Sequence, residues 1–120
     1  MGKRIVVVDD DSMNLRMAEF ILQKDGYEVC KLESGAACLD YLEKDIPDMI
    51  LLDVQMPIMD GFATLEAIRA KEENANIPIA FLTASADENT VEKAKMLGVE
   101  NCVKKPFLPQ DLLECVKKNL

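Results

Sequence analysis

Short apolar segments recur along the chain, separated by longer segments in which apolar residues have a helical spacing. Three of the short segments, Ile5–Val8, Met49–Leu52 and Ile79–Leu82, are apolar throughout. Such runs are typical of strands that are buried on both faces of a sheet. Tyr27–Leu32 and Val99–Val103 contain polar residues as well, and we expect them to be the second and fifth strands.

The segments between these strands carry the start and stop signals of helices. Asp9–Ser12 contains good capping residues, and Met13, Met17 and Phe20 repeat at a helical spacing before Gly26 ends the first helix. The first two predicted helices follow Ser12 and Ser34, and the third follows a turn at Asp60-Gly61. The fourth runs from about Asp87 to Leu97, and the fifth runs from Leu108 to Leu120.

Alternating strands and helices predict a single α/β domain over residues 1–120, with a doubly wound parallel sheet covered by helices on both faces. Right-handed crossovers bring the carboxyl ends of the strands to one edge, where such sheets bind ligands. Several side chains that could bind a ligand or react directly follow predicted strands: Asp9, Asp10, Asp53, Thr83 and Lys105. We therefore expect these five side chains to meet.

Together, these residues suit phosphoryl transfer supported by a divalent cation. Clustered carboxylates repel one another unless protons or a cation intervene, and Mg²⁺ prefers oxygen ligands. Asp53 can act as a nucleophile, Lys105 can neutralise a phosphate oxygen, and the Thr83 hydroxyl can donate to another. Each residue alone also has a structural interpretation, as a helix cap, a turn residue or a surface charge. For Asp11 we favour the helix cap.

Composition narrows the function further. A formal net charge of -8 disfavours nucleic acid as a direct partner. The chain has no histidine, and no C-x-x-C pair occurs among its four cysteines, Cys30, Cys38, Cys102 and Cys115. We therefore expect no zinc site and interpret the cysteines as small buried hydrophobes in a reducing cytoplasm. No segment approaches the roughly 20 apolar residues of a membrane span, and no signal-peptide core follows Met1.

Four segments resemble the receiver domain of response regulators in order and spacing, and the resemblance covers the whole chain. They are Val7–Asp10, Leu51–Gly61, Leu82–Ala84 and Lys104–Phe107. The resemblance implies a flavodoxin-like three-layer sandwich with strand order 2-1-3-4-5. It also implies a phosphoacceptor of two-component or phosphorelay signalling that is not an enzyme, because it catalyses only its own phosphorylation and dephosphorylation.

The resemblance assigns roles to the residues that match its motifs. Asp53 would receive a phosphoryl group from a phosphohistidine on a sensor histidine kinase or histidine phosphotransfer protein. Asp10, Asp53 and the main-chain carbonyl of Gln55 would bind Mg²⁺, with Mn²⁺ as an alternative, and Asp9 would act mostly through a water. Thr83 and Lys105 would hold the phosphate oxygens. The Lys105–Pro106 bond is expected to be cis, which would aim the lysine inward.

Three further positions concern how the phosphate is read and how long it lasts. Receivers usually carry Tyr or Phe where this chain has Cys102, and a cysteine cannot fill the volume of a ring that turns inward behind Thr83. We expect either another side chain in that role or a domain that relays phosphate. Gln55 and Ser85 should flank the path of an attacking water and tune hydrolysis. The resemblance places the family's output face on the fourth helix, the fifth strand and the fifth helix, where it would include Val91, Lys95, Lys104 and Lys117. The same four residues also fit an ordinary solvent-exposed surface.

Other function classes fit the sequence less well. A magnesium-dependent phosphatase with an aspartyl nucleophile commonly has a second Asp where this chain has Gln55. A flavin or nucleotide binder would need a glycine-rich loop after a strand, which is missing. An interaction module with a vestigial acidic edge is disfavoured by the five intact residues. The chain ends do not distinguish a stand-alone protein from a domain of a hybrid kinase or larger regulator.

Overall fold

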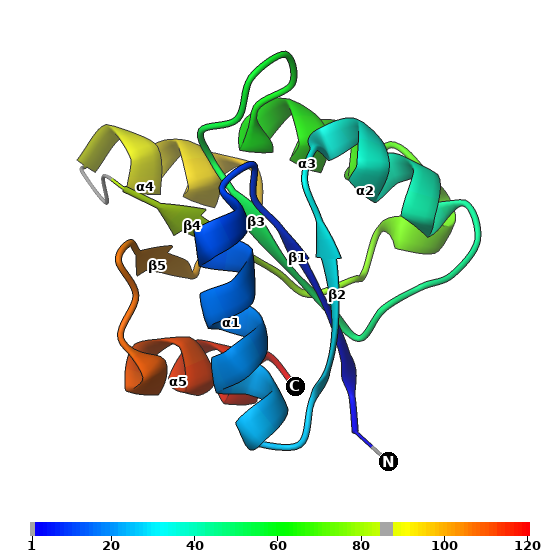
Figure 1. The fold of residues 1–120 in the computed structure, drawn as a ribbon. Helices are drawn as coiled ribbons and strands as arrows, with labels where there is room; N and C mark the ends of the chain where they lie inside the picture. The colour runs from blue at the N-terminus through cyan, green and yellow to red at the C-terminus, as the bar shows by residue number, and fades with distance from the viewer. Residues whose placement is uncertain (1, 85–87) are drawn as a thin grey trace.

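The computed structural model describes residues 2–84 and 88–120, and in these ranges strands alternate with α-helices (Figure 1). The strands are β1 (Arg4–Val8), β2 (Glu28–Leu32), β3 (Met49–Asp53), β4 (Ile79–Thr83) and β5 (Cys102–Lys104). The helices are α1 (Ser12–Lys24), α2 (Gly35–Leu42), α3 (Gly61–Arg69), α4 (Glu88–Met96) and α5 (Pro109–Asn119), and a short 3-10 helix spans Glu72–Asn74. The predicted alternation is confirmed.

The strands form one parallel sheet in the order β2-β1-β3-β4-β5. The order confirms the doubly wound, flavodoxin-like fold class. Val8 of β1 pairs with Leu52 of β3, and Thr83 of β4 pairs with Lys104 of β5. These registers align the carboxyl ends of four adjacent strands, so the segments that follow them share one edge of the sheet.

Helices α1 and α5 cover one face of the sheet, and α2, α3 and α4 cover the other (Figure 1). Successive residues of a strand point to opposite faces. Accordingly, Ile5 and Val7 pack in the cluster under α1 and α5, and Val6 and Val8 pack in the cluster under the other three helices. All four side chains are fully buried. The apolar runs are therefore central strands with two covered faces.

Polar side chains begin the first three helices as their residue types suggest. Asp11 accepts a hydrogen bond from the Met13 amide at 2.9 Å, and Ser34 accepts one from the Ala37 amide at 3.0 Å. Asp60, which was predicted only as part of a turn with Gly61, caps α3. The capping interpretation of Asp11 is thus confirmed.

The fifth strand differs from the prediction, because it begins at Cys102 and not at Val99. Gly98 has a φ of 86°, and the Val99 amide donates to the carbonyl of Ala94 at 2.8 Å. These features end α4 with a left-handed glycine, a common helix stop. The Val99 side chain is buried against this helix end, so its apolar character belongs to the stop of α4 and not to a strand. The predicted start of α4 at Asp87 lies outside the described residues.

The four cysteines are free thiols. Cys38 and Cys115 are buried, and Cys30 and Cys102 are half-buried. Burial raises the pKa of Cys38 to about 12 and that of Cys115 to about 11, so both remain protonated at neutral pH. Across the described residues, no helix has the length and apolarity needed to cross a membrane.

Candidate functional site

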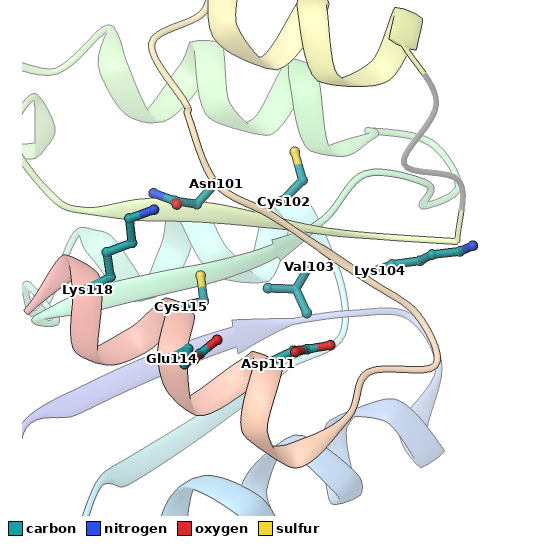
Figure 2. A pocket seen from close by; sticks show the side chains of 8 residues that line it. All are labelled: Asn101, Cys102, Val103, Lys104, Asp111, Glu114, Cys115 and Lys118. Atoms are coloured by element: carbon teal, nitrogen blue, oxygen red, sulfur yellow. The ribbon is translucent and has the colours of Figure 1, made fainter.

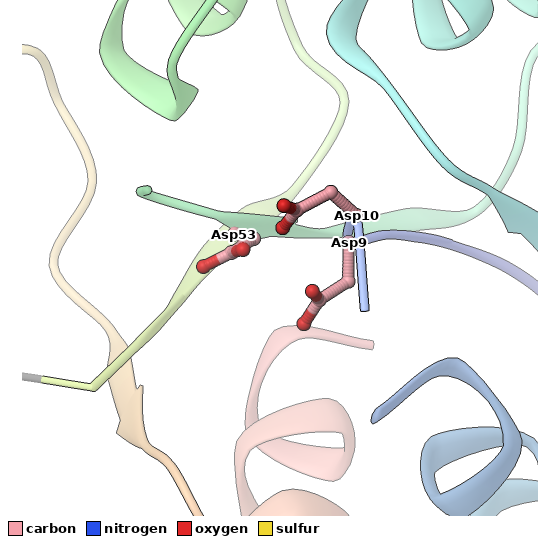
Figure 3. Close-up of side chains that lie close together, drawn as sticks. All are labelled: Asp9, Asp10 and Asp53. Atoms are coloured by element: carbon pink, nitrogen blue, oxygen red, sulfur yellow. The ribbon is translucent and has the colours of Figure 1, made fainter. Parts of the chain in front are cut away.

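Three carboxylates meet where β1 and β3 end. Asp9 and Asp10 directly follow β1, and Asp53 is the last residue of β3, the neighbouring strand. Each residue offers a carboxylate oxygen, and these oxygens lie within 4.8 Å of one another (Figure 3). In the described ranges this is the only such group of three or more acidic, cysteine or histidine side chains. The strand order therefore brings together acids that are far apart in sequence.

The three acids differ in their surroundings. Asp9 and Asp53 are 0% and 1% exposed, whereas Asp10 is exposed to solvent. The Asp11 amide donates to Asp9 Oδ1 at 2.9 Å, and the Gln55 amide donates to Asp53 Oδ1 at 3.3 Å. Asp53 Oδ2 is buried and has no hydrogen-bond partner among the described residues. An unpartnered oxygen of a buried carboxylate is costly, which indicates a place for a ligand.

Lys105 lies in the loop after the edge strand β5 and forms ion pairs with two of the acids. Its Nζ lies 2.9 Å from Asp53 Oδ1 and 3.2 Å from Asp9 Oδ2. Its amide donates to the carbonyl of Thr83 at 2.7 Å, which ties the loop to the end of β4. The bond between Lys105 and Pro106 is cis, as predicted. The lysine side chain is largely buried, so the ion pairs lie away from bulk water.

The surroundings of Asp53 and Lys105 shift the pKa values of both side chains. Burial raises the pKa of Asp53 to about 6, the charge of Asp9 adds to the rise, and the hydrogen bond and charge of Lys105 oppose it. Burial works to lower the pKa of Lys105, but its hydrogen bonds to Asp53 and Asp9 and their charges outweigh burial, so that pKa is raised. Lys105 is therefore a cation at neutral pH and holds Asp53 largely ionised.

Thr83 is the last residue of β4, and its side chain is buried at the same edge of the sheet. Strand β4 lies between β3, which ends at Asp53, and β5, which precedes Lys105. The structure therefore places all five residues that were expected at one edge on that edge. Their roles in phosphoryl transfer stay predictions at this point.

The residues predicted to affect phosphate hydrolysis and readout are Gln55, Ser85 and Cys102. Gln55 is exposed in the loop after β3, and Ser85 lies outside the described residues. Cys102 pairs with Phe81 across β4 and β5 and packs against the apolar cluster under α2, α3 and α4. No aromatic ring occupies this position of β5. In the same apolar cluster, the rings of Phe62 and Phe81 form an edge-on pair with centroids 5.1 Å apart.

The residues of the predicted output face lie on three elements. Val91 and Lys95 lie on α4, and Lys104 ends β5. Lys117, on α5, forms an ion pair with Asp25 at 3.5 Å. Asp25 directly follows α1, so this ion pair links α5 to the end of α1. The role of this face in output stays a prediction.

The loop between β3 and α3 contains a close backbone approach that the sequence pattern does not predict. The Gly61 amide donates to the carbonyl of Val54 at 2.8 Å. A Cβ atom at Gly61 would overlap the main-chain carbonyl oxygen of Asp53. Only glycine fits there without a shift of the backbone that carries Asp53. The Asp60-Gly61 pair was the available signal, but it was interpreted only as a turn.

A separate open cavity of about 550 Å³ lies between β5 and α5 (Figure 2). It is lined by Asn101, Cys102, Val103, Lys104, Asp111, Glu114, Cys115 and Lys118. The three clustered acids do not line it. Its size therefore does not make it the reactive site, which is identified by the carboxylates and Lys105.

The acidic cluster fits a hard divalent cation. Three carboxylates offer oxygen ligands, and the buried oxygen Asp53 Oδ2 lacks another partner among the described residues. Magnesium prefers a few carboxylates together with waters and phosphate oxygens. The exposed carboxylate of Asp10 leaves such a cation in contact with solvent.

Comparisons with known proteins agree with this arrangement. A family model described as the response regulator receiver domain matches residues 5–117. The curated protein "Probable histidine kinase 4" of Oryza sativa subsp. japonica is 36% identical over 143 aligned positions, covering 100% of this chain and 14% of that protein. The chain therefore spans a small part of that relative.

Solved structures show the same fold. The chemotaxis protein CheY4 of Vibrio cholerae matches with a TM-score of 0.94 and 31% identity, and the match covers 100% of both chains. The signal receiver domain of a signal transduction histidine kinase from Syntrophus aciditrophicus matches with a TM-score of 0.89 and 28% identity, covering 99% of this chain and 90% of that one.

Proposed function

This chain belongs to the response regulator receiver family of two-component signalling, and we propose that it takes a phosphoryl group from a phosphohistidine onto Asp53 in a Mg²⁺-dependent reaction. The observation that carries the proposal is the state of the Asp53 carboxylate. Lys105 contacts one oxygen at 2.9 Å, while the other is buried without a hydrogen-bond partner among the described residues, beside two more acids.

In the proposed reaction, an oxygen of Asp53 forms a bond to phosphorus while the bond between phosphorus and the histidine nitrogen breaks. Lys105 is a cation with its Nζ already at Asp53, so it can neutralise charge on a phosphoryl oxygen. The Thr83 hydroxyl would donate to another oxygen. Burial of Asp53 excludes bulk water from its carboxylate, which favours transfer to this oxygen and limits hydrolysis.

A magnesium ion would be held by Asp10, Asp53 and the main-chain carbonyl of Gln55, with Asp9 acting mostly through a water. Bound there, it would offset the negative charge that the carboxylates share with the phosphoryl oxygens. The chain itself contributes the alignment of these ligands, because β1 and β3 are adjacent and end together. Manganese has similar ligand preferences and is the expected substitute.

The proposal extends to the fate of the phosphate. Gln55 and Ser85 would tune hydrolysis of the aspartyl phosphate, because they follow Asp53 and Thr83 at the spacing expected to flank an attacking water. The domain would catalyse only its own phosphorylation and dephosphorylation. With Cys102 in β5, readout would use another side chain, or the domain would pass phosphate to a histidine phosphotransfer protein.

The partners follow from the donor chemistry. Receiver domains pair with sensor histidine kinases or histidine phosphotransfer proteins, and we propose such a protein as the donor. Residues 1–120 would act as one receiver domain, alone or within a longer protein. An output partner would contact α4, β5 and α5, which carry Val91, Lys95, Lys104 and Lys117.

The test is phosphorylation by phosphoramidate, a small donor that needs no partner protein. Wild type should take label only with Mg²⁺ and should bind beryllofluoride only with Mg²⁺. Asp53→Asn should do neither, while Asp40→Asn, at an exposed acid of α2, should match wild type. Label that persists on Asp53→Asn would contradict the acceptor assignment. Magnesium-independent behaviour of wild type would support an interaction module, and turnover of phosphate esters would support a phosphatase.

A further inference from the structure

Ile58 has an unusual backbone in the loop that leads from Asp53 to α3. Its φ is 70°, and the Met59 amide donates to the carbonyl of Pro57 at 2.7 Å across it. A hydrogen bond that spans one central residue of positive φ makes the rare and strained form of the γ-turn. A β-branched residue in this backbone region is an outlier, because its Cβ substituents crowd the main chain. Glycine or asparagine would adopt the same turn at lower cost.

The Ile58 side chain does not pack in the core of the fold. Ile58 has a relative exposure of 109%, the highest among the exposed large apolar residues, and it belongs to neither apolar cluster. Single exposed apolar residues are common on protein surfaces and need no explanation. Ile58 differs from them because exposure is combined with backbone strain. Neither feature contributes to folding stability, so a role outside the folded monomer accounts for both.

The position of Ile58 relates it to the phosphoacceptor. The loop leaves the carboxyl end of β3 at Asp53 and returns to it, since the Gly61 amide donates to the Val54 carbonyl at 2.8 Å. Met13 in the first turn of α1 and Leu108 before α5 are also exposed, and they follow β1 and β5 at the same edge of the sheet. Apolar side chains therefore follow three of the strands that end around the acidic site.

Electrostatics make apolar contacts useful at this edge. The chain carries a formal net charge of -8, and three of its acids cluster at the site. A phosphohistidine is also anionic, so long-range attraction contributes little to the approach of a donor protein. Binding energy from groups remote from the reacting atoms can then position the donor. An exposed isoleucine in the loop that follows Asp53 offers such a contact.

We propose that Ile58 is a docking residue for the protein phosphodonor, which covers its side chain when the phosphohistidine reaches Asp53. The proposal rests on the proposed function and assigns a partner contact to the same site. Small donors such as phosphoramidate do not extend to Ile58. The residue therefore determines selectivity between a protein donor and a small one, and it does not take part in the chemical step.

The test compares two second-order rate constants for each variant. One is for phosphoramidate. The other is for a phosphorylated histidine kinase or histidine phosphotransfer protein from the same organism, chosen as the protein that labels wild type fastest. Ile58→Asn should lower the ratio of protein-donor to phosphoramidate rate constants by roughly tenfold to a hundredfold, the value of burying one large aliphatic side chain. The loss should appear in KM for the donor, with the limiting rate preserved. Ile58→Leu should retain most of the ratio.

Ile46 provides the matched control. It is an exposed isoleucine in the loop before β3, at the opposite end of the sheet from Asp53. Ile46→Asn should leave the ratio unchanged. Thermal unfolding of Ile58→Asn should show a Tm equal to or above that of wild type, because asparagine tolerates positive φ. A loss of transfer would then not reflect unfolding.

Several results would overturn the proposal. They are an unchanged ratio in Ile58→Asn, an equal fall in Ile46→Asn, and a wild type that no protein donor labels faster than phosphoramidate does. Failure of the proposed function gives a different result. In that case wild type would take no label from phosphoramidate, or Asp53→Asn would be labelled as wild type is.

Discussion

Lys105 Nζ lies 2.9 Å from Asp53 Oδ1, although Asp53 ends β3, Lys105 follows β5, and β4 lies between these two strands. The Lys105 amide donates a hydrogen bond to the Thr83 carbonyl, which holds the lysine at the end of β4. The same Nζ contacts Asp9 at 3.2 Å. One cation thus compensates two buried carboxylates, while the second oxygen of Asp53 is left for a ligand.

Removal of this cation should impair the acceptor. In Lys105→Met, two buried carboxylates lose their only ion-pair partner among the described residues. We expect the pKa of Asp53 to rise above its value of about 6, because the opposing effect of Lys105 is gone. Phosphorylation by phosphoramidate should slow by about a hundredfold or more, which is typical for loss of one preorganised charge-stabilising group. Carboxyl NMR titration and labelling rates measure the two effects.

Lys104→Met is the control for this prediction. Lys104 is the exposed neighbour at the end of β5, and none of the ion pairs of the described residues involves it. The substitution removes the same charge from the chain but should leave the Asp53 titration and the labelling rate as in wild type. Equal effects of the two variants would show that net charge, and not the contact with Asp53, controls the acceptor.

The raised pKa of Asp53 predicts a pH dependence of stability in metal-free protein. The folded-state pKa is about 6 and the usual value is 3.8, so between these values the folded state binds more protons than the unfolded state. The free energy of unfolding should therefore rise as the pH falls from about 7 to about 4.5, by an amount on the order of 2 kcal/mol. Urea unfolding of wild type relative to Asp53→Asn isolates this contribution.

Magnesium should stabilise the folded protein more at higher pH, because the cation binds the ionised carboxylate. This is opposite to the pH trend of the metal-free protein. Its apparent affinity should fall as the pH drops below about 6, when Asp53 takes up a proton. Isothermal titration at several pH values measures this dependence. An affinity that stays constant between about pH 7 and about pH 5 would contradict Asp53 as a ligand.

Much of this arrangement could be predicted before the structure. Apolar runs such as Val6–Val8 and Ile50–Leu52 identify central parallel strands, and parallel strands end at one edge whatever their loops contain. That geometry alone places Asp9, Asp53 and Lys105 at one edge of the sheet. The order of the strands was inferred from resemblance, since the alternation of elements does not determine it.

Other features depended on local interactions with no clear sequence signal. Val99 is apolar and β-branched, and the pattern therefore assigned it to a strand, although Gly98 and a hydrogen bond to Ala94 place it at a helix end. Ile58 has the residue type least expected at positive φ. The difference in burial between Asp9 and Asp10 reflects the alternation of side chains as the chain leaves β1.

The adjacent acids Asp10 and Asp11 should separate metal binding from helix stability. Asp11 caps α1 through a 2.9 Å bond from the Met13 amide, so Asp11→Ala should lower the free energy of unfolding by about 1 kcal/mol. It should leave Mg²⁺ affinity within about twofold of wild type, because its carboxylate lies outside the acidic cluster. Asp10→Ala should weaken Mg²⁺ binding strongly and should not lower stability in metal-free protein, because it removes repulsion among acids.

Urea unfolding and Mg²⁺ titration of the two variants provide the measurements, and each variant serves as the control for the other. A loss of Mg²⁺ affinity in Asp11→Ala equal to that in Asp10→Ala would contradict the division of roles. So would a loss of metal-free stability in Asp10→Ala as large as that in Asp11→Ala.

A methyl group at Gly61 should damage the site through the backbone. The added Cβ would overlap the carbonyl oxygen of Asp53, so Gly61→Ala requires the start of α3 or the end of β3 to move. We expect a loss of a few kcal/mol in unfolding free energy, similar to overpacking of a core, together with slower labelling by phosphoramidate. Gly98→Ala is the contrasting variant. There the φ of 86° is unfavourable for alanine, but the new Cβ would meet no described heavy atom within 4 Å beyond its adjacent residues.

The second substitution should therefore cost about 1 kcal/mol through backbone strain and leave the labelling rate unchanged, because Gly98 ends α4 far along the chain from the acids. Chemical denaturation and phosphoramidate kinetics on the two alanine variants compare a steric effect at the acceptor with a conformational effect elsewhere. If Gly61→Ala were as mild as Gly98→Ala in both measurements, the close approach of α3 to the Asp53 carbonyl would not constrain the acceptor. A site that depends on the position of Asp53 requires the opposite result, since a shift of about 1 Å in a reacting group can cost a hundredfold in rate.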